Sequence, residues 1–478
     1  MIDVLIIGCG VTGASAAYEL SRYNLSVMAV DRLNDIAGET TRANSGIVHA
    51  GFDPEPDSVI AKFNVRGNEL IRALSVKLDV PYIQNGSLVL GFNEKDDRTI
   101  RDLYNRGLEN KVPGIEIITA KQVLEMEPKL NSKITSALYA PTGGIVSPWE
   151  LAVALAETAA KNGVIFSLDT DVTGIDHIDG GYLVKTSKGN YETRSVVNAA
   201  GLYADEVHNY LKQPDYKITP VRGQYYLLDK SAGDIVSRTI FQCPDEHGKG
   251  VLVTPTTHGN LLVGPSSENV DCRNDTDTSI ETLHNVLQKA KLSVPDINIR
   301  ENIRNFAGVR AVADTGDFII REAFKRFFDL AGIKSPGLTA APAMAEELVR
   351  MLSASGIELS SKDTFIDERK VIRFRYLSNE QRAKLINQKP SYGHIVCRCE
   401  KITEGEIMDA FNSPLPPTTL DAIKRRCHAG MGRCQGGFCS PKTIALIAER
   451  FGIDPLCVLK DRKGSYVLTG EKGIINNV

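Results

Sequence analysis

The first 31 residues alternate between apolar runs and a glycine-rich break. An apolar run over residues 1–7 has the length of a strand, and Gly8 ends it. Residues 11–22 carry apolar side chains at helical spacing, and a second apolar run over residues 25–30 ends at Asp31. This order of strand, glycine turn, helix, strand and acid predicts a βαβ unit that binds a nucleotide.

Three glycines in the break have separate roles in such a unit. Gly8 allows the tight turn, Gly10 lets the backbone approach a pyrophosphate, and Gly13 lets the helix pack closely on the strand. Asp31 stands where a carboxylate would accept a hydrogen bond from a ribose hydroxyl. The motif does not separate FAD from NAD, and a plain glycine turn is the alternative.

A polar, glycine-rich segment over residues 38–51 follows the acid and contains Asn44, Ser45, Gly46 and His49. Its backbone amides and small hydroxyls suit a ribityl chain and a pyrophosphate. Because only one nucleotide cradle is visible, we expect the bound dinucleotide itself to accept the hydride, as a flavin does. An ordinary surface loop is the alternative.

Short apolar runs later in the chain predict two further groups of strands. Residues 164–166 and 195–198 read as strands, and the second runs into a small-residue turn that ends at Gly201. Residues 217–228 and 250–264 contain short strands with Gly and Pro breaks, which is typical of antiparallel sheet. We expect these later strands to build much of a substrate domain.

Composition limits the function classes. The chain has 478 residues, a net charge of −3 and 42% hydrophobic residues, which predicts two or three globular domains and no basic surface for nucleic acid. No apolar run reaches the length of a membrane span, and no signal pattern opens the sequence. We expect a cytoplasmic protein; peripheral attachment to the inner face of the membrane through a partner stays open.

Five of the nine cysteines fall between residues 397 and 439. Cys397 and Cys399 form a C-x-C pair, and Cys434 and Cys439 form a C-x4-C pair 34 residues further on. Such clustering indicates an iron–sulfur cluster or a soft metal. Structural zinc favours C-x2-C pairs, so we favour iron–sulfur, with zinc and free thiols as alternatives. Cys427 has no ligand role in this pattern.

These motifs together resemble the D-amino-acid-oxidase superfamily of FAD enzymes over about residues 1–355. The opening, residues 44–49, residues 197–205 and residues 332–340 carry the resemblance. Within that superfamily the chain is similar to glycerol-3-phosphate dehydrogenases of the anaerobic type and to L-2-hydroxyglutarate dehydrogenases. The tail resembles the bacterioferritin-associated ferredoxin-like [2Fe–2S] module.

The resemblance implies an α/β (α+β) fold: a Rossmann-like FAD-binding domain, an interleaved antiparallel-sheet substrate domain and a small helical iron–sulfur domain. The expected ranges are 1–80, 140–210 and 300–355 for the FAD domain and 81–139 and 211–299 for the substrate domain. A linker over 356–390 and a [2Fe–2S] domain over 391–460 complete the expected division.

The resemblance also implies site residues. His49 is the candidate base for a substrate hydroxyl, and Arg310 is the candidate partner of the substrate's anionic group. A surface arginine and a structural histidine are the alternatives. Arg222 and Tyr225 are further pocket candidates, with an ordinary strand face as the alternative. The expected cofactor-binding residues are Gly8, Gly10, Gly13, Asp31, Arg32, Thr41, Asn44, Ser45, Gly46, Val172, Gly201, Gly332, Gly337, Leu338 and Thr339, and the expected metal ligands are Cys397, Cys399, Cys434 and Cys439.

The resulting hypothesis is a FAD-dependent dehydrogenase that oxidises sn-glycerol 3-phosphate to glycerone phosphate. Electrons would leave through the [2Fe–2S] cluster to a partner subunit, either a flavoprotein or a quinone-linked protein. Oxidation of a 2-hydroxy acid or an amino acid is one alternative, and a non-catalytic electron-transfer subunit is another.

Overall fold

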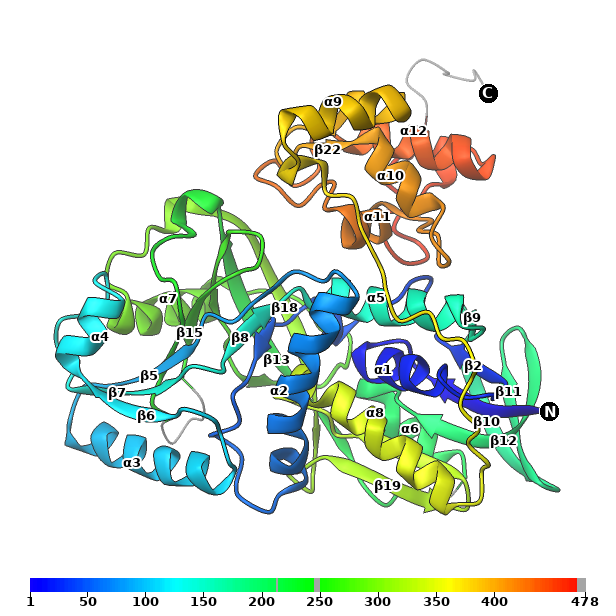
Figure 1. Cartoon of the computed structure of the whole chain (residues 1–478), viewed down its shortest axis with the longest axis horizontal. Coiled ribbons are helices and arrows are strands. Elements are labelled where there is room, and N and C mark those ends of the chain that lie inside the picture. The colour runs from blue at the N-terminus through cyan, green and yellow to red at the C-terminus, as the bar shows by residue number, and fades with distance from the viewer. Residues whose placement is uncertain (212–213, 245–249, 471–478) are drawn as a thin grey trace. The chain divides into compact units, whose positions relative to one another are not determined.

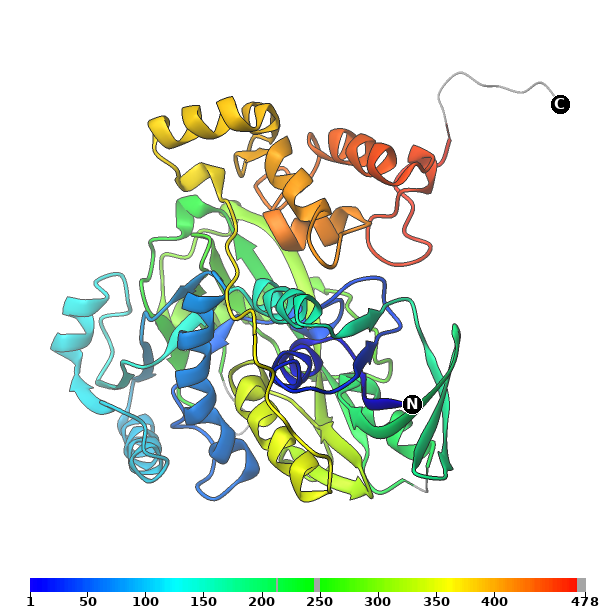
Figure 2. The same cartoon turned by 45° about the vertical axis from the view of Figure 1, so that its right-hand side comes forward.

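The computed structural model describes residues 1–211, 214–244 and 250–470 (Figures 1 and 2). The chain divides into two compact units. The first contains Met1–Arg32 and Ile36–Arg369, and the second contains Leu33–Asp35 and the chain from Lys370 onward. Within the described part of the chain, no helix combines the length and apolar character that crossing a membrane requires.

An eight-stranded sheet forms one half of the first unit, with the strand order β10-β11-β12-β1-β2-β9; β20 pairs with β12 and β19 with β20. The strands are β1 (Ile2–Ile7), β2 (Val27–Val30), β9 (Ile165–Ser167), β10 (Val172–Ile178), β11 (Gly181–Thr186), β12 (Gly189–Asn198), β19 (Ile319–Phe324) and β20 (Phe327–Ala331). Strands β20, β12, β1, β2 and β9 run parallel. Their carboxyl ends therefore meet at one edge, where open α/β sheets bind ligands.

Four helices pack side by side next to this sheet: α1 (Val11–Leu20), α2 (Val59–Lys77), α5 (Pro148–Lys161) and α8 (Gly337–Ala354). Helix α1 lies between α5 and α8, and α8 also packs against α2 (Figures 1 and 2). The buried face of α1 is built of small residues such as Ala14 and Ala17, so its neighbours can approach closely. The predicted βαβ unit is confirmed, with each element one to two residues shorter at its ends than the pattern suggested.

A nine-stranded sheet forms the other half of the first unit, in the order β17-β13-β16-β15-β14-β5-β7-β6, with β18 paired to β13. The strands are β5 (Ser87–Gly91), β6 (Glu116–Thr119), β7 (Ser136–Ala140), β13 (Ile218–Leu228), β14 (Thr239–Gln242), β15 (Leu252–Pro255), β16 (Leu261–Gly264), β17 (Glu268–Asn269) and β18 (Asn302–Ala313). All pairings are antiparallel except β14 with β5, so the predicted antiparallel sheet is confirmed in most of its ladders.

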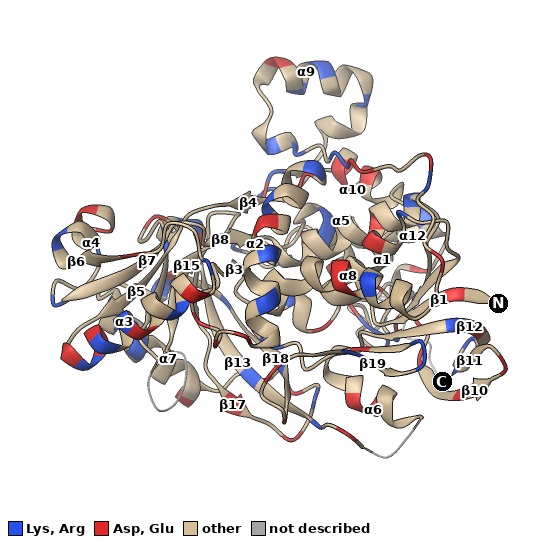
Figure 3. Ribbon diagram, turned by 60° about the horizontal axis from the view of Figure 1, so that its bottom comes forward, with Lys and Arg blue, Asp and Glu red and all other residues tan. Residues whose placement is uncertain are grey.

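Helices cover this second sheet and bury a core of branched aliphatic side chains. They are α3 (Glu94–Glu109), α4 (Ala120–Met126) and α7 (Ile280–Ser293). A fourth helix, α6 (Ala204–Asn209), packs on the first sheet instead. Acidic and basic residues are interspersed along α3 (Figure 3), as on a solvated helix face. A small third sheet joins β3 (Ile47–Val48), β8 (Gly144–Val146) and β4 (Tyr82–Ile83).

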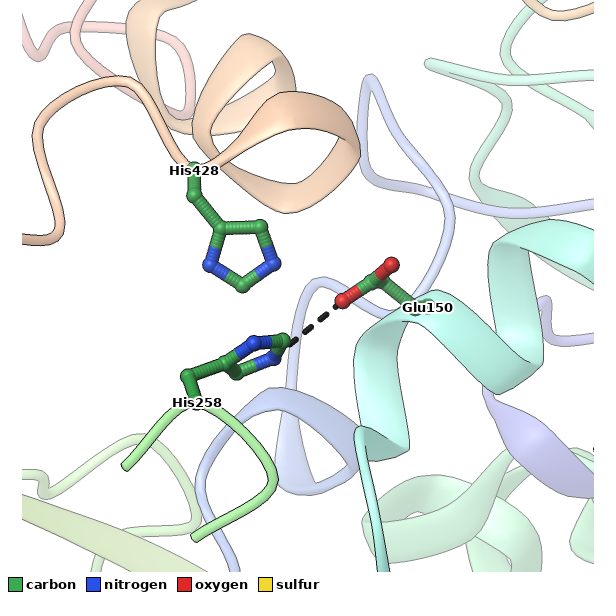
Figure 4. Close-up of side chains that lie close together, drawn as sticks. All are labelled: Glu150, His258 and His428. Atoms are coloured by element: carbon green, nitrogen blue, oxygen red, sulfur yellow. Dashed lines mark ion pairs between the residues drawn. The ribbon is translucent and has the colours of Figure 1, made fainter. Parts of the chain in front are cut away.

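A buried ion pair fixes the start of α5 to the turn between β15 and β16 (Figure 4). Glu150 Oε1 lies 3.2 Å from His258 Nε2, and the ring of Trp149 stacks on the same imidazole. Because both partners of the ion pair are largely buried, replacing one alone would leave a desolvated polar group. The contact links the helix layer to the second sheet within the first unit.

The structure differs from the expected division at two places. Strand β18 lies in the nine-stranded sheet, although its residues were assigned to the FAD domain, because its ladder with β13 runs from Ala313 to Asn302. The expected linker contains helix α9 (Asn379–Gln388), which has a capping box of Ser378 and Gln381. Local helix signals were present there, but α9 has no buried residue and therefore no periodic apolar face. The domain division as a whole stays a prediction.

The second unit is small and mainly helical. It contains β21 (Ile395–Cys397), β22 (Ile402–Thr403), α10 (Glu404–Phe411), α11 (Leu420–Cys427) and α12 (Ser440–Phe451). A capping box of Thr403 and Glu406 begins α10. Ile407, Ile423 and Ile447 form the centre of its core.

Asp35 belongs to this second unit although it lies near the amino terminus. Its carboxylate accepts hydrogen bonds at 2.8 Å from Arg425 Nε and from a terminal nitrogen of Arg426, and all three side chains are buried. Burial alone would raise the pKa of Asp35, but the charges of Arg426 and Arg425 outweigh it and keep that pKa below its usual value. The carboxylate therefore stays charged and holds two guanidinium groups inside the unit.

Candidate functional site

A cavity of about 1070 Å³ opens at the carboxyl edge of the parallel strands in the first unit. Residues that directly follow three of those strands line it: Gly8 after β1, Asp31 after β2 and Ala199 after β12. Its volume is at the upper end of the range of small-molecule pockets, which suits a dinucleotide together with a small substrate.

The glycine turn is held in a conformation that side chains would block. Gly8 has φ of +104°, and a Cβ there would come within 2.4 Å of the carbonyl oxygen of Ala199. A Cβ on Gly13 would lie 1.8 Å from the carbonyl oxygen of Gly8, so the predicted close packing of helix on strand is confirmed. The Cys9 amide donates to Asp31 Oδ2 at 2.6 Å, and the Val11 amide donates to Thr41 Oγ1 at 3.0 Å.

One end of the cavity offers groups for a nucleotide base and ribose. Arg32 follows Asp31 directly, and its guanidinium lies 3.7 Å from the ring centre of Tyr203. Val172 and Gly201 also line this part of the wall. A planar ring, a cation and a carboxylate are thus brought together beside the strand ends.

The segment after η1 (Thr40–Arg42) is tied to the start of α8. Asn44 Nδ2 donates to the carbonyl oxygens of Thr40 and Thr41, and Asn44 Oδ1 accepts from the Gly46 amide. Thr339 Oγ1 accepts from the His49 amide at 2.9 Å and donates to the carbonyl oxygen of Ile47. These bonds fix the backbone on both sides of Ser45.

His49 is held by its backbone, and its ring points to a second hydroxyl group. Asn64 and Asn68 both donate to its carbonyl oxygen, at 3.0 and 3.1 Å. The imidazole Nε2 lies 3.2 Å from Ser335 Oγ, and the ring centre lies 6.0 Å from that of Phe241. A histidine whose backbone is fixed in this way presents a ring nitrogen to the cavity with a reproducible geometry.

Arg310 and Tyr225 form a second polar group of the same cavity. Arg310 donates to the Ser266 carbonyl oxygen at 2.8 Å, and the Tyr225 hydroxyl is hydrogen-bonded to Arg310 and Ser45. Tyr225 stacks on Phe306 with ring centres 4.8 Å apart. Burial raises the pKa of Tyr225 despite the neighbouring guanidinium, so the phenol stays a protonated hydrogen-bond donor.

The structure brings most of the expected residues to this cavity. Those that line it are Gly8, Gly10, Asp31, Arg32, Thr41, Asn44, Ser45, His49, Val172, Gly201, Arg310, Gly337 and Leu338. Gly13, Gly46, Gly332 and Thr339 stand outside the lining. Of the two further pocket candidates, Tyr225 lines the cavity, whereas Arg222 forms ion pairs with Glu268 and Asp275 instead.

Sequence reasoning missed several lining residues. Ser335, Phe241, Tyr203 and Ser266 all line the cavity. No local motif marks Phe241 or Ser266. Phe241 reaches the wall through the pairing of β14 with β5, and the Ser266 amide is held by the carbonyl oxygen of Gln224. Ser335 stands inside a segment that carried the family resemblance, so its proximity to that glycine loop was an available signal.

The shape and polarity of the cavity fit FAD. Gly8 and Gly10 leave room for close approach of the backbone to a ligand. The first amides of α1 face the cavity edge, and the Asp31 carboxylate follows β2. Gly337 and Leu338 at the start of α8 line the opposite part of the wall, and the structure as described shows no side chain capping that helix. These residues would hold the pyrophosphate, the ribose and the ring system of a flavin dinucleotide.

Four thiols come together in the second unit in two pairs. Cys397 is hydrogen-bonded to Cys439, and Cys399 is hydrogen-bonded to Cys434. The bond from Cys439 lowers the pKa of Cys397 to about 6, which favours the thiolate that metals bind. A Cβ on Gly432 would come within 2.3 Å of Cys399 Cβ, so glycine is required for this approach.

The backbone groups around these thiols suit an iron–sulfur cluster. Backbone amides of Gly430, Gly436 and Phe438 donate to the sulfurs, as is usual around iron–sulfur clusters.

Cys427 stands apart from the four thiols, as the sequence indicated. It ends α11, and its Sγ donates to the carbonyl oxygen of Ile423. Burial raises the pKa of this thiol to about 12, so it is a poor ligand and a poor nucleophile.

A dinucleotide cavity at the edge of a parallel sheet and a cage of four cysteines together define a flavin- and iron–sulfur-containing oxidoreductase. Comparison with known families agrees. Residues 3–351 match the family "FAD dependent oxidoreductase", and residues 395–449 match the family "BFD-like [2Fe-2S] binding domain". The chain belongs to the FAD-dependent oxidoreductase family, and its cofactors are FAD and a [2Fe–2S] cluster.

Three individual proteins show which members of the family the chain is similar to. It is 46% identical over 473 residues to glycerol 3-phosphate dehydrogenase of Caloramator mitchellensis, covering 98% of both chains. The structure of dithionite-reduced L-alpha-glycerophosphate oxidase from Mycoplasma pneumoniae with FAD bound superposes with a TM-score of 0.74 at 34% identity, covering 78% of this chain and 99% of that one. Mitochondrial L-2-hydroxyglutarate dehydrogenase of Arabidopsis thaliana is 26% identical, covering 73% of this chain and 82% of its own.

The thiol geometry predicts the metal content of the purified protein. Cys434→Ser should lower iron and acid-labile sulfide well below two of each per chain, because it removes one of four ligands. Cys427→Ser is the matched control and should keep both. Metal analysis and electron paramagnetic resonance after one-electron reduction measure the outcome. One zinc ion per chain in the unmodified protein would contradict the iron–sulfur assignment.

Proposed function

We propose that this protein oxidises sn-glycerol 3-phosphate to glycerone phosphate and passes the electrons through its [2Fe–2S] cluster to a partner subunit. The observation that carries the proposal is the 46% identity to a glycerol 3-phosphate dehydrogenase over 98% of both chains, the cysteine-bearing tail included. The likeness to L-2-hydroxyglutarate dehydrogenases is lower in identity.

The polar groups around Arg310 suit a small phosphate ester. Its guanidinium would bind the phosphate with two parallel hydrogen bonds, and the protonated Tyr225 hydroxyl would donate a further one. The carbonyl oxygen of Ser266 holds the guanidinium in place at 2.8 Å. Because Tyr225 is 3% exposed, the anion would be bound beside a dry wall where charge–charge attraction is strong.

His49 would take the proton of the substrate hydroxyl as the hydride leaves the carbon. Its backbone is fixed by Thr339, Asn64 and Asn68, so the ring can keep one position relative to the bound substrate. Ser335 Oγ at 3.2 Å from Nε2 can orient the imidazole. Removal of the hydroxyl proton by the imidazole makes hydride loss from the substrate carbon favourable.

Bound FAD supplies the hydride acceptor, and the bound cluster supplies a one-electron carrier. Gly8, Gly10, Asp31 and Arg32 would hold the adenosine and pyrophosphate part. The amides at the start of α8 would stabilise negative charge at the other end of the cavity. The remaining expected cofactor-binding residues would support the segments that hold FAD. Cys397, Cys399, Cys434 and Cys439 would ligate the cluster.

A one-electron carrier at the tail implies an acceptor outside this chain, because an enzyme that discharges to dioxygen needs no such carrier. We therefore propose a partner electron-transfer subunit, either a flavoprotein or a quinone-linked protein. A cytoplasmic location, with or without attachment to the inner membrane face through that partner, stays a prediction.

Anaerobic mixing with candidate substrates tests the function. Glycerol 3-phosphate should bleach the flavin absorbance within one turnover, and L-2-hydroxyglutarate and amino acids should not. Bleaching by 2-hydroxyglutarate alone would instead support the alternative that the protein oxidises a 2-hydroxy acid. A flavin that no candidate substrate bleaches would support a non-catalytic subunit.

His49→Ala should slow flavin reduction by about 100-fold or more without releasing FAD, because a positioned base contributes at least that much. Stopped-flow absorbance measures the rate, and the flavin content of the purified variant measures FAD retention. His284→Ala, at an exposed position on α7, is the control. An unchanged rate in His49→Ala would remove the residue from its proposed role.

Arg310→Ala should raise the glycerol 3-phosphate concentration for half-maximal flavin reduction about 10- to 100-fold, because a charge-assisted hydrogen-bond pair is lost. Arg222→Ala removes a guanidinium from the same sheet, but one that is paired with Glu268 and Asp275. It should leave that concentration within about twofold. Equal effects in the two variants would contradict a direct contact of Arg310 with the phosphate.

A further inference from the structure

The loop between Cys434 and Cys439 presents an aromatic side chain to solvent. Phe438 is 84% exposed and directly precedes Cys439. Single exposed hydrophobic residues are common on protein surfaces and need no explanation by themselves. The position of Phe438 beside two candidate cluster ligands is the reason to look further.

The backbone of Phe438 contacts one of those ligands. Its amide donates a hydrogen bond to the sulfur of Cys434, while the peptide bond joins it to Cys439. Cys399 is itself exposed at the surface of the same unit. Phe438 therefore lies on the Cys399–Cys434 side of the thiol cage, where Cys399 is exposed.

The exposed charges of the two ligand-bearing segments, residues 395–401 and 430–442, are all basic. They are Arg398, Lys401, Arg433 and Lys442. The one acidic residue in these segments, Glu400, is buried and paired with Arg375 at 2.6 Å. Because the whole chain has a net charge of −3, this basic character is local.

We propose that Phe438 with Arg398, Lys401, Arg433 and Lys442 forms a basic docking face for an acidic one-electron acceptor protein. This inference rests on the proposed function, since it concerns the exit of electrons from the same enzyme. Each glycerol 3-phosphate loses two electrons and two protons, so two acceptor molecules are each reduced by one electron. Exposed aromatic residues serve as anchors in protein interfaces, and basic residues of the same surface steer an acidic partner to it.

Two one-electron acceptor proteins of opposite charge serve as probes: acidic plastocyanin and basic cytochrome c. The full-length enzyme with both cofactors should bind copper-free plastocyanin in surface plasmon resonance at low ionic strength and should bind cytochrome c far more weakly. Plastocyanin binding should decline steeply with added salt, because exposed charges are screened. With substrate present, the enzyme should reduce copper-loaded plastocyanin faster than cytochrome c.

Two variants test the residues. Phe438→Ala should weaken binding of copper-free plastocyanin about tenfold, as for an interface hot spot. Lys401→Glu with Lys442→Glu should weaken it at least as much at low ionic strength and very little in about 1 M salt. The matched controls are Tyr466→Ala and Lys384→Glu with Lys463→Glu, at exposed positions of the same unit outside the ligand-bearing segments. The controls should bind like the unmodified protein.

The readouts separate this inference from the proposed function. If both test variants bind and reduce plastocyanin as well as the unmodified protein, the docking face is wrong, whatever the substrate. If plastocyanin binding follows the prediction but glycerol 3-phosphate does not bleach the flavin, the proposed substrate is wrong and the face stands. A test variant whose cluster signal appears more slowly after substrate is added, without any acceptor, would overturn the docking role and assign the residues to an earlier electron-transfer step.

Discussion

The close approach of α1 to β1 is the constraint on which the first unit depends. A Cβ at Gly13 would lie 1.8 Å from the Gly8 carbonyl oxygen, so only glycine lets the helix begin directly above the strand end. That approach places the helix amino terminus at the carboxyl edge of the sheet, where Asp31 and Ala199 also emerge. The cavity, its orientation and the place for a pyrophosphate all follow from this one contact.

Local signals predicted the parts of the structure that short-range chemistry decides. The βαβ unit, the capping box at Thr403 and the paired thiols of the tail are each specified within a few tens of residues. The substrate end of the cavity was predictable only through family resemblance. Arg310 and Tyr225 meet because β18 pairs with β13 in one particular register, and a shift of one residue would turn either side chain to the other face. The same pairing places β18 in the nine-stranded sheet, although the family resemblance implied the FAD domain for residues 300–355.

The two units use different kinds of residue for two different kinds of redox chemistry. In the first unit, an imidazole, a guanidinium and a phenol line one cavity, which suits the proposed removal of a hydride and a proton from a small anion. In the second unit, thiols and backbone amides form a small cage, which suits the transfer of single electrons. A substrate that gives up two electrons at once therefore requires both kinds of centre when the acceptor takes one at a time.

Asp35 has a consequence for how the tail can be studied. The carboxylate that neutralises Arg425 and Arg426 comes from a segment more than 300 residues earlier in the chain, only a few residues beyond the carboxylate that follows β2. A fragment that starts at residue 370 would keep Asp461 as a partner of Arg425 but would bury the Arg426 guanidinium without the Asp35 carboxylate, at a cost of roughly 3–5 kcal/mol. Residues 33–35 are therefore needed together with the chain from residue 370 onward when the iron–sulfur region is studied by itself.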